Sequence, residues 1–327
     1  MSNIKFIQGN CLDKIKELPD NYIDCVISSP PYFGLRDYGM KEQFGLESNY
    51  KDYINNTIKV FETFKSKLKD EATIWWNVGD SYHNFRPTNN KQKLYKHPAY
   101  PKQSISGNRR DLPIESLKRN QRYNDIKEKD LMMIPNRVAI ALQENGWYIR
   151  SEIIWVKPNH MPESVKDRPT CCHEKIWLIT KNKKYYYDCD IIKEPLSESS
   201  VKRYESSWKG NGKRDYPFSQ KNNLDKYFGS DKAKEDALKG KNKRNVWTIT
   251  TKPCREAHFA TFPIDLIEPC VLAGCKEGGT ILDPFSGAGT TGIAAKKHNR
   301  NAILIELNPK YIEIAKKRIQ KIFGELI

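Results

Sequence analysis

The residues with the clearest chemical pattern form a glycine-rich turn late in the chain. The turn reads Asp283-Pro284-Phe285-Ser286-Gly287-Ala288-Gly289-Thr290-Thr291-Gly292. It lies between an apolar run at 279–282, which predicts a buried strand, and a predicted helix at 290–297. Glycines let the backbone approach a ligand, and a helix N-terminus offers free N–H groups. A second predicted strand, 302–305, ends at Glu306, whose carboxylate can accept hydrogen bonds from a ribose diol, so the pattern predicts a nucleoside site.

Two classes of cofactor use a turn of this kind, and a plain tight turn before a helix is the structural alternative. Gly287, Gly289 and Gly292 match the G-x-G-x-x-G spacing of dinucleotide-binding sites. Such a site usually opens its domain, however, whereas this turn lies late in the chain. Asp283 at the strand tip would also repel a pyrophosphate. A sulfonium cofactor carries a cation and an ammonium group and tolerates the carboxylate, so we expect S-adenosylmethionine rather than NAD.

A second motif, Ser29-Pro30-Pro31-Tyr32, follows an apolar strand pattern at 23–28. The two prolines carry no backbone N–H, so carbonyl oxygens and the Ser29 hydroxyl are offered as acceptors without competing donors. Tyr32 adds a flat ring on which a planar group can stack. The motif suits an exocyclic amino group on an aromatic ring, although a Pro-Pro turn with a surface tyrosine would have the same sequence.

Together the two motifs resemble those of the DNA amino-methyltransferases, which methylate N4 of cytosine or N6 of adenine. Their order, with the tetrapeptide first and the cofactor turn last, is similar to the β-ordered group of that family. The resemblance covers most of the chain except roughly 84–130 and 190–245. It implies an α/β fold with a doubly wound, mostly parallel sheet, a reversed terminal strand and ligands at the carboxyl ends of the strands. An NAD-dependent oxidoreductase and a catalytically silent DNA-binding relative remain the alternatives.

The resemblance also implies roles for individual residues. The predicted catalytic residues are Ser29, Pro30, Pro31 and Tyr32. The predicted cofactor-binding residues are Asn10, His258, Phe259, Ala260, Thr261, Phe262, Asp283, Pro284, Phe285, Gly287, Gly289, Thr290, Glu306 and Asn308. Asn10 and Asn308 also suit helix N-caps. Serine at position 29, where adenine-N6 members usually carry an acidic residue, favours cytosine N4 as the target, with adenine N6 as the alternative.

The positive charge of the chain is concentrated in two segments. The net charge is +16, of which segment 84–130 carries +7 (12 Lys and Arg, 5 Asp and Glu) and segment 191–245 carries +6 (14 against 8). Such clustering predicts double-stranded DNA as the partner, held by phosphate contacts. Solvated lysine-rich loops or linkers are the alternative. The predicted DNA contacts are Arg36, Arg109, Arg110, Arg119, Arg122, Lys202, Arg203, Lys213, Arg214, Lys243 and Arg244.

These motifs and segments predict one methyltransferase domain with two insertions. The catalytic half spans 1–83, the basic insertion 84–130, the continued domain 131–190, the target-recognition region 191–245 and the cofactor-binding half 246–327. Residues 33–47 are expected to form a mobile loop over the active site.

The remaining elements are predicted from apolar periodicity and turn residues. Helices are expected at 11–18, 50–68, 131–145, 264–274 and 309–322. Strands are expected at 4–9, 72–78, 147–156 and 174–180, and the last should pair in a hairpin with a strand at 185–188.

Several classes of site and location are not expected. No apolar run reaches the length of a membrane span and the first residues do not resemble a signal peptide, so we expect a cytoplasmic protein. The eight cysteines form no C-x-x-C pair, and adjacent cysteines such as Cys171 and Cys172 rarely ligate one ion, so we expect no metal. A cognate restriction endonuclease is a candidate partner, and the chain is expected to be a monomer or homodimer.

Overall fold

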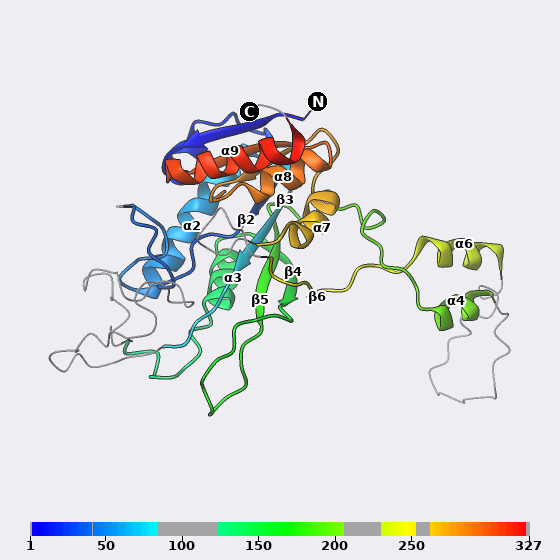
Figure 1. The fold of residues 1–327 in the computed structure, drawn as a ribbon, viewed down its shortest axis with the longest axis horizontal. Helices are drawn as coiled ribbons and strands as arrows, with labels where there is room; N and C mark the ends of the chain where they lie inside the picture. The colour runs from blue at the N-terminus through cyan, green and yellow to red at the C-terminus, as the bar shows by residue number, and fades with distance from the viewer. Residues whose placement is uncertain (1, 41, 84–122, 206–229, 253–261, 325–327) are drawn as a thin grey trace. The chain divides into compact units, whose positions relative to one another are not determined.

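The computed structural model describes residues 2–40, 42–83, 123–205, 230–252 and 262–324. The chain divides into two compact units, one of Met1–Tyr186 with Asn245–Ile327 and the other of Tyr187–Arg244. Within the second unit, helices α4 (Glu198–Glu205) and α6 (Asp231–Lys239) pack against each other (Figure 1). The segment predicted for target recognition, 191–245, falls almost entirely in this unit, and its role stays a prediction.

The first unit is built on one eight-stranded sheet in the order β1-β8-β7-β2-β3-β5-β4-β6. Its strands are β1 (Ile4–Gln8), β2 (Ile23–Ser28), β3 (Leu68–Val78), β4 (Tyr148–Val156), β5 (His173–Thr180), β6 (Val246–Thr248), β7 (Thr280–Asp283) and β8 (Asn301–Glu306). Neighbouring strands are parallel except where β5 pairs with β3 and β4. The predicted α/β class with a mostly parallel sheet is therefore confirmed.

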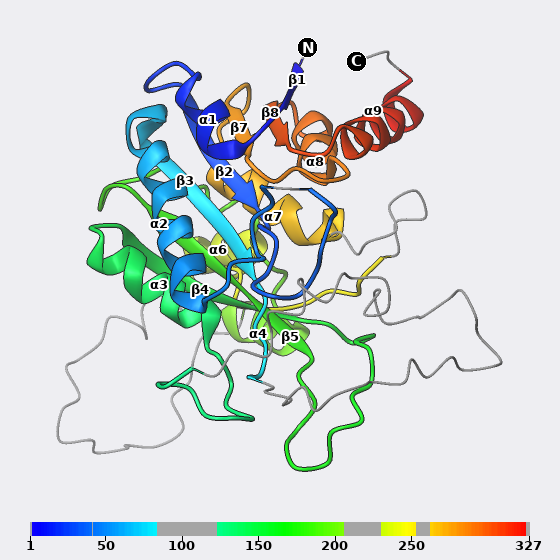
Figure 2. The ribbon, with the colours of Figure 1, turned by 90° about the vertical axis from the view of Figure 1, so that its left-hand side faces the viewer.

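Helices cover both faces of this sheet, as a doubly wound fold requires (Figure 2). The helices of the first unit are α1 (Cys11–Lys16), α2 (Tyr50–Lys67), α3 (Ile134–Glu144), α7 (Ile264–Gly274), α8 (Thr290–Lys297) and α9 (Pro309–Phe323). Helix α2 contacts α1 and α3 on one face, and α8 contacts α7 and α9 on the other. The chain therefore crosses to the second face after β6.

Two neighbouring tryptophans on β3 show how the sheet organises both layers. Successive side chains of a strand point to opposite faces. Trp76 packs against Phe61 and Phe64 of α2, with its ring centroid 5.0 Å from that of Phe61. Trp75 faces α7, where a side chain at Gly274 would collide with its indole. Both tryptophans are almost fully buried, so β3 is a central strand of the core.

The reversed strand lies inside the sheet and not at its end. After β4 the chain turns back and β5 inserts between β3 and β4, with Thr73 and Tyr148 both paired to Thr180. Strand β6 then adds to the remaining edge of β4 in the parallel sense. The predicted hairpin strand at 185–188 is wrong, because both edges of β5 are already paired. The Tyr186 N–H instead donates to the Glu71 carbonyl at 2.9 Å.

The predicted helix at 131–145 begins three residues later, at Ile134. Leu131 forms a bridge to Tyr82, which holds this part of the chain in an extended conformation. Met133 then has a left-handed conformation with φ of 55°, which a helix cannot continue through. The predicted boundaries of α2 and α7, by contrast, agree with the structure to within one residue.

Among the described residues, no helix is both long enough and apolar enough to cross a membrane. Across the same residues, no cluster of three or more His, Cys, Asp or Glu side chains could hold a metal ion.

Candidate active site

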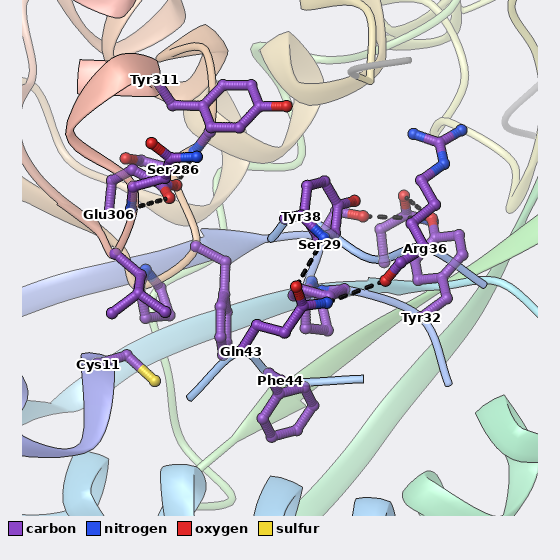
Figure 3. Close-up of a pocket in the computed structure, with 18 of the residues that line it drawn as sticks. Cys11, Ser29, Tyr32, Arg36, Tyr38, Gln43, Phe44, Ser286, Glu306 and Tyr311 are labelled. Atoms are coloured by element: carbon purple, nitrogen blue, oxygen red, sulfur yellow. Dashed lines mark hydrogen bonds between the residues drawn. The ribbon is translucent and has the colours of Figure 1, made fainter. Parts of the chain in front are cut away.

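A cavity of about 410 Å³ lies at the carboxyl ends of strands β1, β2, β7 and β8 (Figure 3). Residues that directly follow each of these strands form part of its wall. Ser286 and Glu306 lie on one side, and Ser29, Tyr32 and Arg36 lie on the other. The structure thus brings the proline-containing tetrapeptide and the glycine-rich turn to one space, although they are more than 250 residues apart in sequence.

Most of the described residues that were predicted for the site line this cavity. They are Asn10, Ser29, Pro30, Pro31, Tyr32, Arg36, Phe262, Pro284, Phe285, Gly287, Thr290, Glu306 and Asn308. Asp283 and Gly289 do not line it. Residues 258–261, predicted to line the cofactor pocket, lie outside the described residues.

Asp283 is buried and organises the turn from within. Its carboxylate accepts hydrogen bonds from the hydroxyls of Ser28 at 2.6 Å and Thr291 at 2.5 Å. It also accepts one from the Phe285 backbone N–H at 3.1 Å. Burial raises the pKa of this carboxyl group from 3.8 to about 6. These contacts join the end of β2, the turn and the first residues of α8, so Asp283 acts on the site by holding the turn in shape.

The first two glycines of the turn meet different needs. Gly289 has φ of 77°, and a Cβ there would lie 2.7 Å from the Cβ of Ala315 on α9. Glycine is therefore required both for the backbone conformation and for the close approach of α9. Gly287 has φ of 49° but open space where a Cβ would lie, and its N–H donates to Glu306 Oε2 at 2.8 Å.

Glu306 has both of its carboxylate oxygens fixed by backbone donors. Oε2 accepts from Gly287 and Oε1 accepts from the Asn308 N–H at 2.8 Å. Burial raises the pKa of this carboxyl group above its usual range. A carboxylate offers about four acceptor positions, so two bonds from the backbone leave capacity for a ligand hydroxyl.

The two asparagines predicted for the site also cap helices. Asn10 accepts from the Leu12 N–H at 3.0 Å at the start of α1. Asn308 accepts from the Lys310 N–H at 3.0 Å at the start of α9. Each therefore has a structural role and a place in the cavity wall.

Ser286 lines the cavity but was not among the residues predicted from the sequence. Its hydroxyl is buried and makes no hydrogen bond within the described part of the chain. A buried polar group without a partner is costly, so this hydroxyl stands out among the residues around the cavity. The adjacent Phe285 ring lies 5.3 Å from that of Phe44 and supplies an apolar surface. This side of the cavity therefore combines polar groups with an apolar wall.

The tetrapeptide is held by residues from two other strands. The Ser29 hydroxyl lies 3.2 Å from the Tyr32 hydroxyl. Tyr32 in turn contacts Glu174 Oε2 at 2.6 Å and Asn77 Oδ1 at 3.0 Å. Burial, together with the Glu174 carboxylate, raises the pKa of the Tyr32 phenol well above its usual range. Tyr32 is therefore a neutral hydrogen-bonding group.

Glu174 and Asn77 were also missed in the sequence. Asn77 stands near the carboxyl end of β3, and Glu174 stands near the start of β5. Because β5 runs antiparallel to β3 and β4, its first residues lie beside the last residues of these two strands. The direction of β5 could have pointed to Glu174. That direction depends on strand pairing, however, and local sequence does not show it.

Residues 33–47 supply further parts of the cavity wall, including Arg36, Tyr38 and Gln43. The Gln43 side chain ties this segment together, because it accepts from the Tyr38 N–H at 2.6 Å and donates to the Arg36 carbonyl at 2.9 Å. The mobility predicted for the segment is not tested by these contacts.

The predicted DNA contacts are only partly described. Arg109, Arg110, Arg119, Arg122, Lys213 and Arg214 lie outside the described residues. In the second unit, Lys202 and Arg203 belong to α4, and Lys243 and Arg244 lie 3.6 and 3.4 Å from carboxylate oxygens of Glu194.

Comparison with known proteins identifies the class to which this fold and site belong. The family model described as DNA methylase, of the N6 and N4 methyltransferase type, matches residues 23–317. The chain is 38% identical over 320 residues to the Type II methyltransferase M.Cfr9I of Citrobacter freundii, which covers 98% of this chain and 89% of the relative. It is 39% identical over 326 residues to M.SmaI of Serratia marcescens, with 98% and 91% covered.

Two solved structures share the fold. The PvuII DNA methyltransferase, described as cytosine-N4-specific, aligns with a TM-score of 0.61 at 16% identity over 100% of this chain and 93% of that one. A putative DNA modification methylase from Thermus thermophilus, in complex with S-adenosyl-L-methionine, aligns with a TM-score of 0.54 at 18% identity over 98% and 95%. The chain belongs to the DNA methylase family, and it is a DNA amino-methyltransferase. The oxidoreductase alternative is thereby set aside.

Proposed function

We propose that this enzyme transfers a methyl group from S-adenosylmethionine to N4 of cytosine in double-stranded DNA. The observation that carries the proposal is that the Ser29 hydroxyl and the Glu306 carboxylate line the same cavity. An acceptor for an amino group and an acceptor for a nucleoside therefore share one space. Serine at position 29 and the fold shared with a cytosine-N4-specific enzyme favour cytosine over adenine.

The cofactor fits the side of the cavity formed by the glycine-rich turn. S-adenosylmethionine supplies an electrophilic methyl group when bound. Glu306 would accept from the ribose hydroxyls, and the partnerless Ser286 hydroxyl would gain a polar partner. The open space beside Gly287 lets a ligand approach the backbone, and Phe285 offers an apolar face. In this proposal Asp283 binds no cofactor and only fixes the turn.

The target amine sits beside the tetrapeptide. An aromatic amine is a poor nucleophile because its lone pair is delocalised into the ring. Acceptors on its N–H bonds localise that lone pair, and the Ser29 hydroxyl and the Pro30 carbonyl are the proposed acceptors. The base must leave the duplex to reach them. We assign Tyr32 to stack on it; a side chain at Gly79 would collide with the Tyr32 ring, so glycine there makes room for it.

DNA binding and target choice are assigned to the two basic segments. Segments 84–130 and 191–245 together carry +13 of the net charge of +16. Deleting 195–240 should abolish sequence-specific methylation and leave cofactor binding largely intact. A deletion variant that kept its site preference would move recognition to 84–130. The Type II relatives support a cognate restriction endonuclease as partner, and a monomer or homodimer is proposed.

The target base is tested by identifying the product. Duplex DNA is incubated with the enzyme and S-adenosylmethionine, digested to nucleosides and analysed by mass spectrometry. N4-methylcytosine is expected. N6-methyladenine would contradict the choice of base while leaving the amino-methyltransferase assignment intact, and tight NAD binding in a parallel titration would contradict the cofactor.

A further inference from the structure

A chain of hydrogen bonds leads from the catalytic side of the cavity to an ion pair. It runs from Ser29 Oγ to Tyr32 Oη over 3.2 Å and from Tyr32 Oη to Glu174 Oε2 over 2.6 Å. The other carboxylate oxygen, Oε1, is bonded to Lys157 Nζ, which lies 4.3 Å above the Trp155 ring. Oε2 is therefore the oxygen that faces Tyr32. Ser29, Tyr32, Lys157 and Glu174 all line the cavity.

The chemistry of these groups fixes the direction of the chain. A carboxylate in an ion pair only accepts hydrogen bonds, so the single phenolic proton of Tyr32 is donated to Glu174. Asn77 Oδ1 shares that proton at 3.0 Å, but the contact to the charged oxygen is shorter and stronger. The Tyr32 oxygen is then free to accept from the Ser29 hydroxyl. Ser29 Oγ is left with lone pairs for an N–H group in the cavity.

We propose that this chain removes the proton that methylation releases, with Glu174 as its terminal acceptor; the inference rests on the proposed function. Transfer forms the bond between the amino nitrogen and the methyl carbon and breaks the bond from that carbon to sulfur. The nitrogen gains positive charge as its bond to carbon forms, and in the same step it loses one proton to Ser29 Oγ. The Ser29 proton passes to Tyr32 Oη, and the Tyr32 proton passes to Glu174 Oε2. The amine ends neutral and Glu174 ends protonated.

The surroundings of Glu174 support this role. The side chains of Glu174 and Lys157 are 16% and 19% exposed, so the pair lies at the edge of the solvent and can return the proton after turnover. Of the three other carboxylates that line the cavity, Glu42 is exposed and two are already occupied by backbone or amide donors. Glu306 accepts from Gly287 and Asn308, and Glu47 accepts from Gly45 and Asn56. Neither is joined to Ser29 by hydrogen bonds that the structure describes.

Glu174→Gln is the decisive variant, because its neutral amide cannot take up the proton while Asn77 can still hold the Tyr32 hydroxyl in place. Positioned proton transfer contributes roughly 10²–10⁴-fold to a rate, so we expect single-turnover methyl transfer to fall about 100-fold or more. Cofactor and DNA affinities should stay at wild-type values. Glu174→Asp should restore part of the rate. Glu152→Gln is the matched control, because Glu152 on β4 forms an ion pair with Lys175 on β5 but does not line the cavity.

Two measurements keep the test independent of any one variant. Tyr32→Phe breaks the chain in the middle with Glu174 intact, and it should lose the rate to a similar extent. In the cofactor-free protein, the phenolic C–O infrared band of Tyr32, isolated as the difference between wild type and Tyr32→Phe, should shift in Glu174→Gln. Wild-type transfer rates in both Glu174→Gln and Tyr32→Phe would overturn the inference. A wild-type enzyme that methylates no DNA would instead overturn the proposed function.

Discussion

The buried carboxylate at the base of the cofactor turn should make stability depend on pH. Asp283 is 1% exposed, and burial raises the pKa of its carboxyl group from 3.8 to about 6 in the folded protein. Folding therefore favours the protonated form. Its contribution to stability is fully present below about pH 3.8 and is lost as pH rises through about 6. At about 1.4 kcal/mol for each pKa unit, the loss between pH 4 and pH 7 is about 2–3 kcal/mol.

Asp283→Asn removes this titration and keeps most of the contacts. The amide oxygen can accept from Ser28 and from the Phe285 N–H, and the amide nitrogen can donate to the Thr291 hydroxyl. The free energy of unfolding of the wild type, minus that of the variant, should therefore fall by about 2–3 kcal/mol from pH 4 to pH 7.

The assay is urea unfolding followed by tryptophan fluorescence at a series of pH values. Glu277→Gln, which changes an exposed carboxylate, serves as the control and should show no such trend. A difference between wild type and Asp283→Asn that stays constant with pH, or rises with it, would refute the reasoning.

Three further predictions concern the turn and the DNA. Glu306→Ala should weaken S-adenosylmethionine binding in calorimetry by about 1–3 kcal/mol, because ligand hydroxyls lose their acceptor. Glu313→Ala, which changes an exposed carboxylate, should leave the affinity unchanged. Equal affinities of Glu306→Ala and the wild type would count against placing the ribose hydroxyls at Glu306. Gly289→Ala should lower the unfolding free energy by about 1–3 kcal/mol, because the new Cβ would collide with Ala315. Gly287→Ala should lower it less, because its Cβ would lie in open space. A larger loss in Gly287→Ala than in Gly289→Ala, measured by urea unfolding, would contradict the packing. DNA affinity should fall linearly with salt on a logarithmic scale, and a salt-independent affinity would exclude phosphate contacts as the main attraction.

The parts of the fold that were predicted correctly depend on local pattern. Helix α2 was found because its apolar residues recur at helical spacing. Its caps, Asn49 and Leu68, place both ends within one residue of the prediction. Strands β2, β7 and β8 were found because they are short apolar runs bounded by turn residues. The class of the sheet was implied by the resemblance to the DNA amino-methyltransferases, and the structure confirms it.

The parts that were missed depend on contacts between distant residues. Asp283 was expected to face the cofactor, but its carboxylate turns toward Ser28, 255 residues away, and no local pattern shows this. Glu174 reaches the catalytic motif only because β5 is reversed and inserted between β3 and β4. The absence of a strand at 185–188 has the same origin, because it follows from the pairing of both β5 edges.

The most direct test of the central claim is to follow a ¹³C-labelled methyl group from S-adenosylmethionine into duplex DNA with purified wild type and Ser29→Ala. With the wild type, label is expected on the exocyclic nitrogen of a DNA base. With Ser29→Ala, a strongly reduced rate is expected at nearly unchanged cofactor affinity. Label on a ring carbon would exclude amino methylation, and a Ser29→Ala variant as fast as the wild type would exclude Ser29 as an acceptor for the target amine.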